Sequence, residues 1–158
     1  MDVTTTPSLV AKWQASAPRL LSLLRIMLAF VFLQAGTMKL FAFPIGMPPN
    51  GGTPPLWSEF GIAGILETFG GALALVGLLT RPIAFLFAGE MAVAYFQFFA
   101  PQGFWPIATQ GALPAICCFA WLYISAAGAG PWSLDARRRR DLGTYQHVDF
   151  AGPRSTRP

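Results

Sequence analysis

The chain alternates between long apolar stretches and short polar segments. Four apolar stretches cover residues 20–43, 60–79, 82–100 and 111–128. A helix needs about 20 mostly apolar residues to cross the hydrocarbon core of a bilayer, and each stretch is close to that length. We therefore predict an all-α fold, an integral membrane bundle of four antiparallel helices.

The segments outside these stretches divide the chain into three parts. Residues 1–19 form a polar N-terminal segment, 20–130 hold the four spans, and 131–158 form a basic tail, whose polar part after the arginine run we predict to be disordered. Between the first two spans, residues 43–59 contain five prolines and three glycines, which exclude a helix there. We predict that this loop forms an ordered cap over one end of the bundle.

Composition agrees with a membrane protein. Hydrophobic residues make up 54% of the chain and charged residues only 11%, whereas a soluble domain carries about 25% charged residues. The two cysteines, 117 and 118, are adjacent within the fourth stretch and are predicted to be packing residues. No cluster of ligands predicts a metal site.

Positive charges gather on one side of the predicted bundle. They precede the first span, occupy the turn between the second and third, and follow the fourth, at Lys12, Arg19, Arg81, arginines 137–140, Arg154 and Arg157. The positive-inside rule places that side, with both termini, in the cytoplasm. An arginine run beside a span sets topology and contacts anionic lipid, so we predict the bilayer as a partner and no nucleic acid.

A few ionisable residues lie inside the apolar stretches, where a charge is costly and by default marks a function. Arg25 and Lys39 fall on one face of the first helix, about 21 Å apart at 1.5 Å per residue. By depth, Lys39 matches Glu67, and Arg25 matches Glu90. We predict these two ion pairs inside the bundle.

Two interpretations remain open for each pair. Lys39 and Glu67 either form the polar floor of an outward-facing pocket for a quinone head or a small sulfur anion, or they fix the helix register. Glu90 and Gln97 either line a proton or substrate path, or Glu90 serves only an interhelical hydrogen bond or the pair with Arg25. The candidate substrate-binding residues are thus Lys39, Glu67, Arg25, Glu90 and Gln97, and no catalytic residue is assigned.

Glycines 64, 70, 71 and 77 are predicted to allow close packing within the bundle rather than dimerisation.

Several short motifs resemble the DoxX-like family of small bacterial four-helix membrane proteins. They are Leu24-Arg25, Gly36-x-x-Lys39-Leu40, Gly64-x-x-Glu67-x-x-Gly70-Gly71, the segment from Gly77 to Arg81 and the segment from Gly130 to Asp135. The likeness covers about residues 20–136. The Asn-Gly-Gly-Glu-like start that the family often shows in its last span is absent, since residues 109–112 read Thr-Gln-Gly-Ala.

The resemblance implies a multi-pass protein of the bacterial inner membrane. It also implies a membrane subunit of a quinone- or thiol-linked redox system, as in thiosulfate:quinone oxidoreductase or oxidative-stress defence. Any enzymatic role would be that of an oxidoreductase subunit, with a soluble redox enzyme as partner and a quinone as the implied ligand; no cofactor is evident from the residues themselves. The alternatives are a scaffold that recruits a soluble partner through its arginines and a small-solute carrier, which would require a homo-oligomer.

Overall fold

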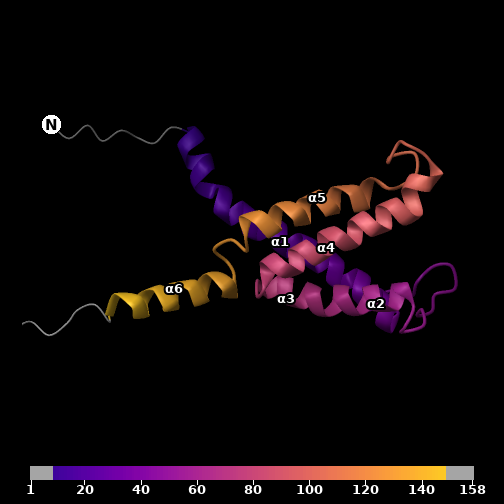
Figure 1. Ribbon diagram of the computed structural model, residues 1–158, viewed down its shortest axis with the longest axis horizontal. Coiled ribbons are helices and arrows are strands. Elements are labelled where there is room, and N and C mark those ends of the chain that lie inside the picture. Colours follow the sequence, from indigo (N-terminus) through magenta and orange to yellow (C-terminus); the bar gives the residue numbers. More distant parts are fainter. Residues whose placement is uncertain (1–8, 149–158) are drawn as a thin grey trace, which may run out of the picture.

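A computed structural model describes residues 9–148, which are helical apart from their connections (Figure 1). The first rod is α1 (Leu9–Phe41). The second joins α2 (Glu59–Ile65), the π-helical turn η1 (Leu66–Gly70) and α3 (Gly71–Val76). The third joins α4 (Thr80–Ala94), the π-helical turn η2 (Tyr95–Phe99) and the 3-10 turn η3 (Ala100–Gln102). Two more helices follow, α5 (Ala112–Ala127) and α6 (Leu134–Val148).

The four predicted apolar stretches each correspond to one rod. The first three rods are long and apolar enough to cross a membrane, while α5, at 16 residues, is shorter. Large apolar side chains on their outer surfaces, such as Phe85 and Phe119, are exposed, as expected for surfaces that face lipid. The all-α membrane architecture is confirmed.

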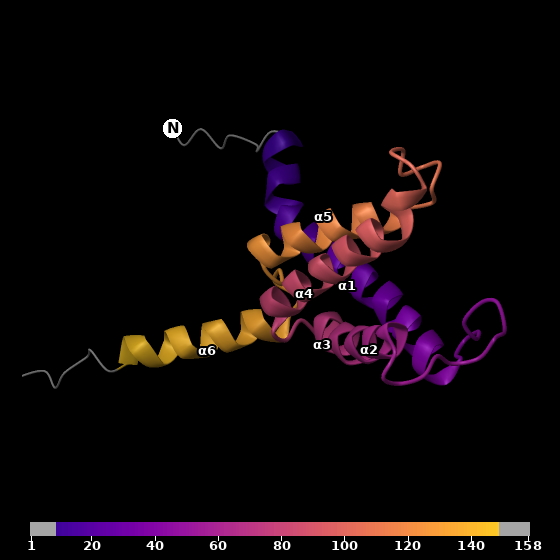
Figure 2. The ribbon, with the colours of Figure 1, turned by 45° about the vertical axis from the view of Figure 1, so that its right-hand side comes forward.

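The first helix is longer than its apolar stretch. It begins at Leu9 rather than near residue 20 and runs for 33 residues, about 50 Å at 1.5 Å per residue. Its N-terminal part changes direction (Figure 2), and Pro18, which lies inside the helix, is the residue type that produces such bends. Residues 1–8 of the predicted N-terminal segment lie outside the described part of the chain.

The rods are arranged as two closely packed pairs. One pair is α1 with the α2–η1–α3 rod, and the other is α4 with α5 (Figures 1 and 2). Glycines bring the first pair together: a Cβ on Gly36 would overlap the backbone of Thr68, and one on Gly71 would lie 2.9 Å from the Leu33 nitrogen. Of the predicted glycines, Gly64 and Gly71 lie similarly close to α1, Gly70 to α4 and Gly77 to Ser133, so close packing within the bundle is confirmed for these four.

An aromatic cluster joins the two pairs. It consists of Phe32 from α1, Phe87 from α4 and Trp121 from α5, whose side chains are all buried. The ring centroid of Phe32 lies 4.6 Å from that of Phe87 and 5.3 Å from that of Trp121, and the Phe87 and Trp121 centroids are 5.0 Å apart. Beyond the cluster the pairs diverge toward the end that carries loop 42–58 and residues 103–111 (Figure 1). We call this the loop end, and the opposite end, with the α3–α4 turn, residues 128–133 and α6, the basic end.

The basic tail begins with a regular helix that continues past the arginine run to Val148, so the prediction of disorder after that run is wrong for residues 141–148. Ser133 stabilises the start of this helix, because its hydroxyl accepts a hydrogen bond from the Ala136 nitrogen at 3.1 Å and thereby caps α6. Asp135 in the first turn adds a favourable charge for the helix dipole. Residues 149–158, including Arg154 and Arg157, lie outside the described part.

Candidate functional site

The predicted polar residues near the loop end surround a pocket of about 250 Å³ between the second and third rods. We call it the loop-end pocket. Its walls are mainly apolar and its polar groups come from three different rods. They are Lys39 at the end of α1, Glu59 and Glu67 on the second rod, and Glu90 on α4; the apolar lining is Phe60, Ile62, Ala63, Leu66, Met91, Val93, Ala94 and Phe98.

Lys39 and Glu67 form the predicted ion pair. The Lys39 Nζ donates to the Glu67 carboxylate, whose side chain is only 3% exposed. Gly64, one turn before Glu67, allows this contact because its missing Cβ leaves room for the Lys39 side chain. The pair lies at the floor of the pocket, but no residue of loop 42–58 lines it, so the prediction that this loop caps the bundle is wrong for the pocket.

That loop is nevertheless ordered. The backbone nitrogen of Met47 donates to the Gly52 carbonyl at 3.0 Å, and the Gly51 nitrogen donates to the Met47 carbonyl at 2.9 Å. These bonds close the loop on itself. It therefore extends away from the rods (Figure 2) and leaves the mouth of the pocket uncovered.

Glu90 lies in the same pocket but not in an ion pair. Both of its carboxylate oxygens are buried, and neither has a hydrogen-bond partner among the described residues. The three ionisable groups at the base of the pocket are thus two acids and one base. Because Lys39 is paired with Glu67, it does not neutralise Glu90. A buried carboxyl without a partner is costly, so Glu90 requires a proton, a cation or a hydrogen-bond donor from elsewhere.

Gln97 was predicted to continue the Glu90 stripe, and the structure places it elsewhere. Its amide nitrogen donates to Glu59 at 3.0 Å, at the exposed rim of the pocket. The π-helical turn at Tyr95–Phe99 explains the difference, because a π turn shifts the face that 100° spacing assigns to each residue. Glu59 itself was missed, although an acid at the start of the second stretch was visible in the sequence.

Both π-helical turns flank this region. Glu67 lies within η1, and η2 begins five residues after Glu90. Such turns frequently mark functional sites, because they place side chains that a regular helix would direct elsewhere.

Arg25 is far from this pocket in the fold, and its predicted pairing with Glu90 is wrong. Its guanidinium is fully buried at the basic end and donates to backbone carbonyls. The acceptors are Ala74 and Leu75 (2.7 Å) at the end of α3, Ala129 (2.9 Å) and Trp132 (2.6 Å). Carbonyls at helix ends lack partners within the helix, so Arg25 needs no acid and serves as a structural residue.

Asp135 provides further hydrogen bonds at the basic end. Its carboxylate accepts from the backbone nitrogens of Leu79 (3.1 Å) and Thr80 (2.9 Å), and so binds the start of α4. Burial would raise the pKa of Asp135, but these hydrogen bonds and the nearby Arg139 outweigh it and hold the pKa below its ordinary value. The motifs around Arg25, Gly77 and Gly130–Asp135 thus meet to close the basic end.

No group of three or more His, Cys, Asp or Glu side chains that could hold a metal occurs within the described residues. The chemistry that the loop-end pocket offers is proton exchange and hydrogen bonding in an apolar setting.

Comparison with known proteins gives consistent results. The sequence model of the DoxX family matches residues 20–100, which include Arg25, Lys39, Glu67 and Glu90. The chain is 40% identical over 124 residues to an uncharacterized protein of Haemophilus influenzae, covering 75% of this chain and 90% of that protein. It is 27% identical over 145 residues to an uncharacterized membrane protein of Mycobacterium tuberculosis, covering 83% and 88% of the two chains. No solved structure matches the chain.

Proposed function

The chain belongs to the DoxX family of membrane proteins, and we propose, on that premise, that it is the membrane subunit of a redox system and binds a quinone or quinol headgroup in the loop-end pocket. The single observation that carries this proposal is the buried Glu90 carboxyl, which has no hydrogen-bond partner among the described residues and faces an apolar pocket beside an ion pair.

The pocket has the size and polarity that such a headgroup needs. Ligand pockets usually measure about 300–1,000 Å³, so 250 Å³ suits one ring rather than a whole large ligand. Phe60 and Phe98 lie on its wall with their rings stacked at a centroid separation of 5.6 Å. Ile62 and Val93, which are exposed toward lipid, allow an isoprenoid tail to remain in the bilayer.

The ionisable groups match the reaction of a quinone. A quinol hydroxyl would donate to Glu90, while Lys39 would donate to a quinone carbonyl and stabilise negative charge that develops there. Reduction of a quinone takes up electrons and protons in equal number. Glu90 is placed to supply these protons one after the other, with reprotonation from water at the uncovered mouth of the pocket, while Glu67 stays ionised beside Lys39. The electrons would come from a soluble thiol- or thiosulfate-oxidising partner.

Binding of a short-chain quinone to the purified protein in nanodiscs tests the proposal. We expect ubiquinone-1 or a short-chain menaquinone to raise the melting temperature of the wild type. Ala94→Phe, which fills the pocket without changing its charge, should abolish the shift. Ala72→Phe is the matched control, because Ala72 is exposed and does not line the pocket. Equal shifts in the two variants would refute quinone binding in this pocket.

Glu90→Gln separates binding from proton exchange. The glutamine keeps the size of the side chain and can still hydrogen-bond the headgroup, but it cannot take up or release a proton. We expect quinone binding to persist within about tenfold, while quinone reduction in membranes that contain the partner system falls by about 10²–10⁴, the usual contribution of an acid–base group. An unchanged reduction rate at normal protein level would exclude Glu90 from proton exchange.

A second function, recruitment of a soluble protein, is favoured by the geometry of α6. This helix extends away from the bundle (Figures 1 and 2) and carries the consecutive arginines 137–140. A partner with an acidic face would bind there. Replacing these arginines by glutamine should then abolish membrane recruitment of the partner while leaving quinone binding intact. Replacing Lys39 or Glu67 should have the opposite effect.

A further inference from the structure

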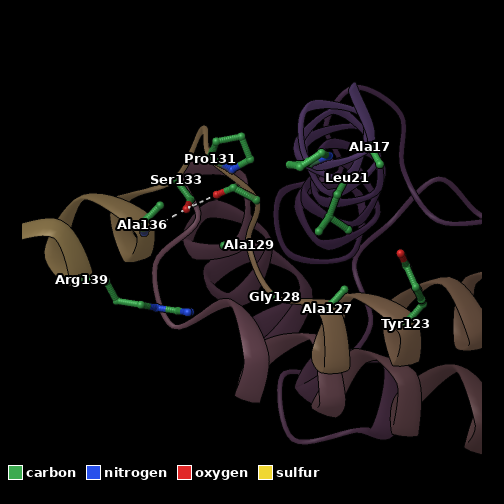
Figure 3. A pocket seen from close by; sticks show the side chains of 12 residues that line it. Ala17, Leu21, Tyr123, Ala127, Gly128, Ala129, Pro131, Ser133, Ala136 and Arg139 are labelled. Carbon is green, nitrogen blue, oxygen red and sulfur yellow. Dashed lines mark hydrogen bonds between the residues drawn. The ribbon is translucent and has the colours of Figure 1, made fainter. Parts of the chain in front are cut away.

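A second and larger cavity lies at the basic end, where the loop between α5 and α6 passes beside α1 (Figure 3). It measures about 550 Å³ and shares no lining residue with the loop-end pocket. Leu21 on α1 and Ala127 on α5 contribute apolar walls, Arg139 comes from α6, and Tyr123 lies on the far side (Figure 3). We propose that this cavity binds the phosphate headgroup of an anionic phospholipid.

The depth of the cavity is that of lipid headgroups. Trp132, in the loop that borders it, and Trp13, near the start of α1, are both exposed, and exposed tryptophans concentrate at membrane–water interfaces. Leu20 and Leu24, which flank Leu21 on α1, are exposed apolar side chains. Acyl chains of a lipid held by its headgroup in the cavity can therefore remain against the apolar surface of α1.

One arginine lines the cavity, and a second comes close to its edge at Gly128. Arg139 extends from α6 toward Gly128 (Figure 3), and a guanidinium nitrogen of Arg81 lies 3.4 Å from the position that a Cβ on Gly128 would take. Neither guanidinium donates a hydrogen bond to another described residue. Arginine binds phosphate through paired hydrogen bonds, and basic pockets between membrane helices on the cytoplasmic side are typical sites for anionic headgroups.

The nearest acid, Asp135, interacts electrostatically with Arg139, but a single carboxylate beside Arg139 and Arg81 leaves a net positive charge. Asp135, one turn before Arg139, accepts hydrogen bonds from the backbone of Leu79 and Thr80. The Tyr123 hydroxyl donates to no described residue, and it can serve the phosphate or glycerol oxygens from the opposite wall. The charge balance therefore favours an anionic phospholipid over a zwitterionic one.

Native mass spectrometry of protein released from nanodiscs tests the proposal. With equal phosphatidylglycerol and phosphatidylcholine in the disc, we expect the wild type to retain phosphatidylglycerol selectively. Arg139→Gln should weaken its apparent affinity for phosphatidylglycerol about fivefold, the effect of one basic residue at an anionic surface. Arg137→Gln is the matched control, since it removes the same charge from the same helix but borders a different cavity.

A third variant tests the cavity without altering charge. Ala127→Trp fills the space and should reduce phosphatidylglycerol retention to background. Equal retention of both lipids by the wild type would overturn the proposal without recourse to any variant. Equal loss in Arg137→Gln and Arg139→Gln would do so too, because it would indicate attraction by the whole basic helix. Displacement of the lipid by millimolar inorganic phosphate would assign the site to a soluble anion instead. None of these outcomes depends on the quinone proposal.

Discussion

Arg25 and Lys39 occupy the same face of α1, yet their partners differ in kind. Lys39 binds the carboxylate of Glu67, whereas Arg25 binds four backbone carbonyl oxygens, two at the end of α3 and two in the loop between α5 and α6. A planar guanidinium presents several donors in fixed directions, which suits several fixed acceptors, and an ammonium is a compact charge that one carboxylate can neutralise. The residue type therefore determines which buried cation closes the fold and which one contributes to a pocket.

Loss of one member of the Lys39–Glu67 pair should be costly. Lys39→Met or Glu67→Met alone leaves an unpaired charge in an apolar interior, and we expect each to reduce the free energy of unfolding by about 3–5 kcal/mol. The double variant should recover most of that loss, because no buried charge remains. Thermal or denaturant unfolding in detergent measures the coupling.

Glu59→Gln is the control for these single and double variants, since Glu59 is exposed and its side chain hydrogen-bonds only to Gln97 among the described residues. It should change stability by less than about 1 kcal/mol. Additive effects of the Lys39 and Glu67 changes would show that the two side chains do not stabilise each other.

The positions of the rods could be predicted from the sequence, because the length of each apolar stretch determines where a membrane-spanning helix can form. The second stretch, 60–79, became Glu59–Val76, and the fourth, 111–128, became Ala112–Ala127. Three features were not predictable from a regular helical period: the π turns that hold Glu67 and move Gln97, the extension of α1 to Leu9, and α6. The hydropathy pattern encodes neither the π turns nor the Ser133 cap of α6, because both are local backbone features.

Close approach of α1 to the second rod leads to a prediction about glycine. Gly36→Ala would drive a Cβ into the backbone of Thr68, and we expect it to cost about 1–3 kcal/mol of stability through overpacking. Gly89→Ala is the matched change on α4, where a Cβ meets nothing within 4 Å. It should stabilise the protein by about 0.5–1 kcal/mol, because alanine loses less conformational freedom in a helix. Melting temperatures that move in the same direction would contradict the packing of the first pair.

The contact between Asp135 and the start of α4 should depend on pH. The pKa of Asp135 is lowered in the folded protein, so its stabilising effect is complete above the unfolded value of about 3.9 and is lost as the pH falls through the lower folded value. Asp135→Asn should cost about 1 kcal/mol at neutral pH, as the loss of a helix cap does.

The difference in unfolding free energy between wild type and Asp135→Asn is the measurement. It should stay constant from neutral pH down to about 5 and shrink below about 4. A difference that grows on acidification would show that the carboxylate does not cap α4.

At the scale of the whole molecule, the two ends of the bundle are packed differently. The basic end is closed by hydrogen bonds that Arg25 donates and that Ser22 and Asp135 accept, which connect α1, α3, α4 and the loop before α6. The aromatic cluster then holds the two helix pairs together at mid-length. Beyond it the pairs diverge, which creates the loop-end pocket. A rigid junction at one end thus permits an opening at the other.

This polarity predicts the orientation in the membrane. Arg81 and arginines 137–140 lie at the basic end, whereas the loop end carries Lys39 within an ion pair and the acid Glu59. From the positive-inside rule we expect the basic end to face the cytoplasm and the pocket to open toward the outer face. A green fluorescent protein fused after residue 158 should fluoresce, and alkaline phosphatase inserted after residue 50 should be active. Replacing Arg81 and arginines 137–140 by glutamine should reduce both signals, because the charge difference between the two ends would then be small. The reverse pattern in the unaltered chain would place the pocket on the cytoplasmic side, where a quinone would exchange protons with the cytoplasm instead.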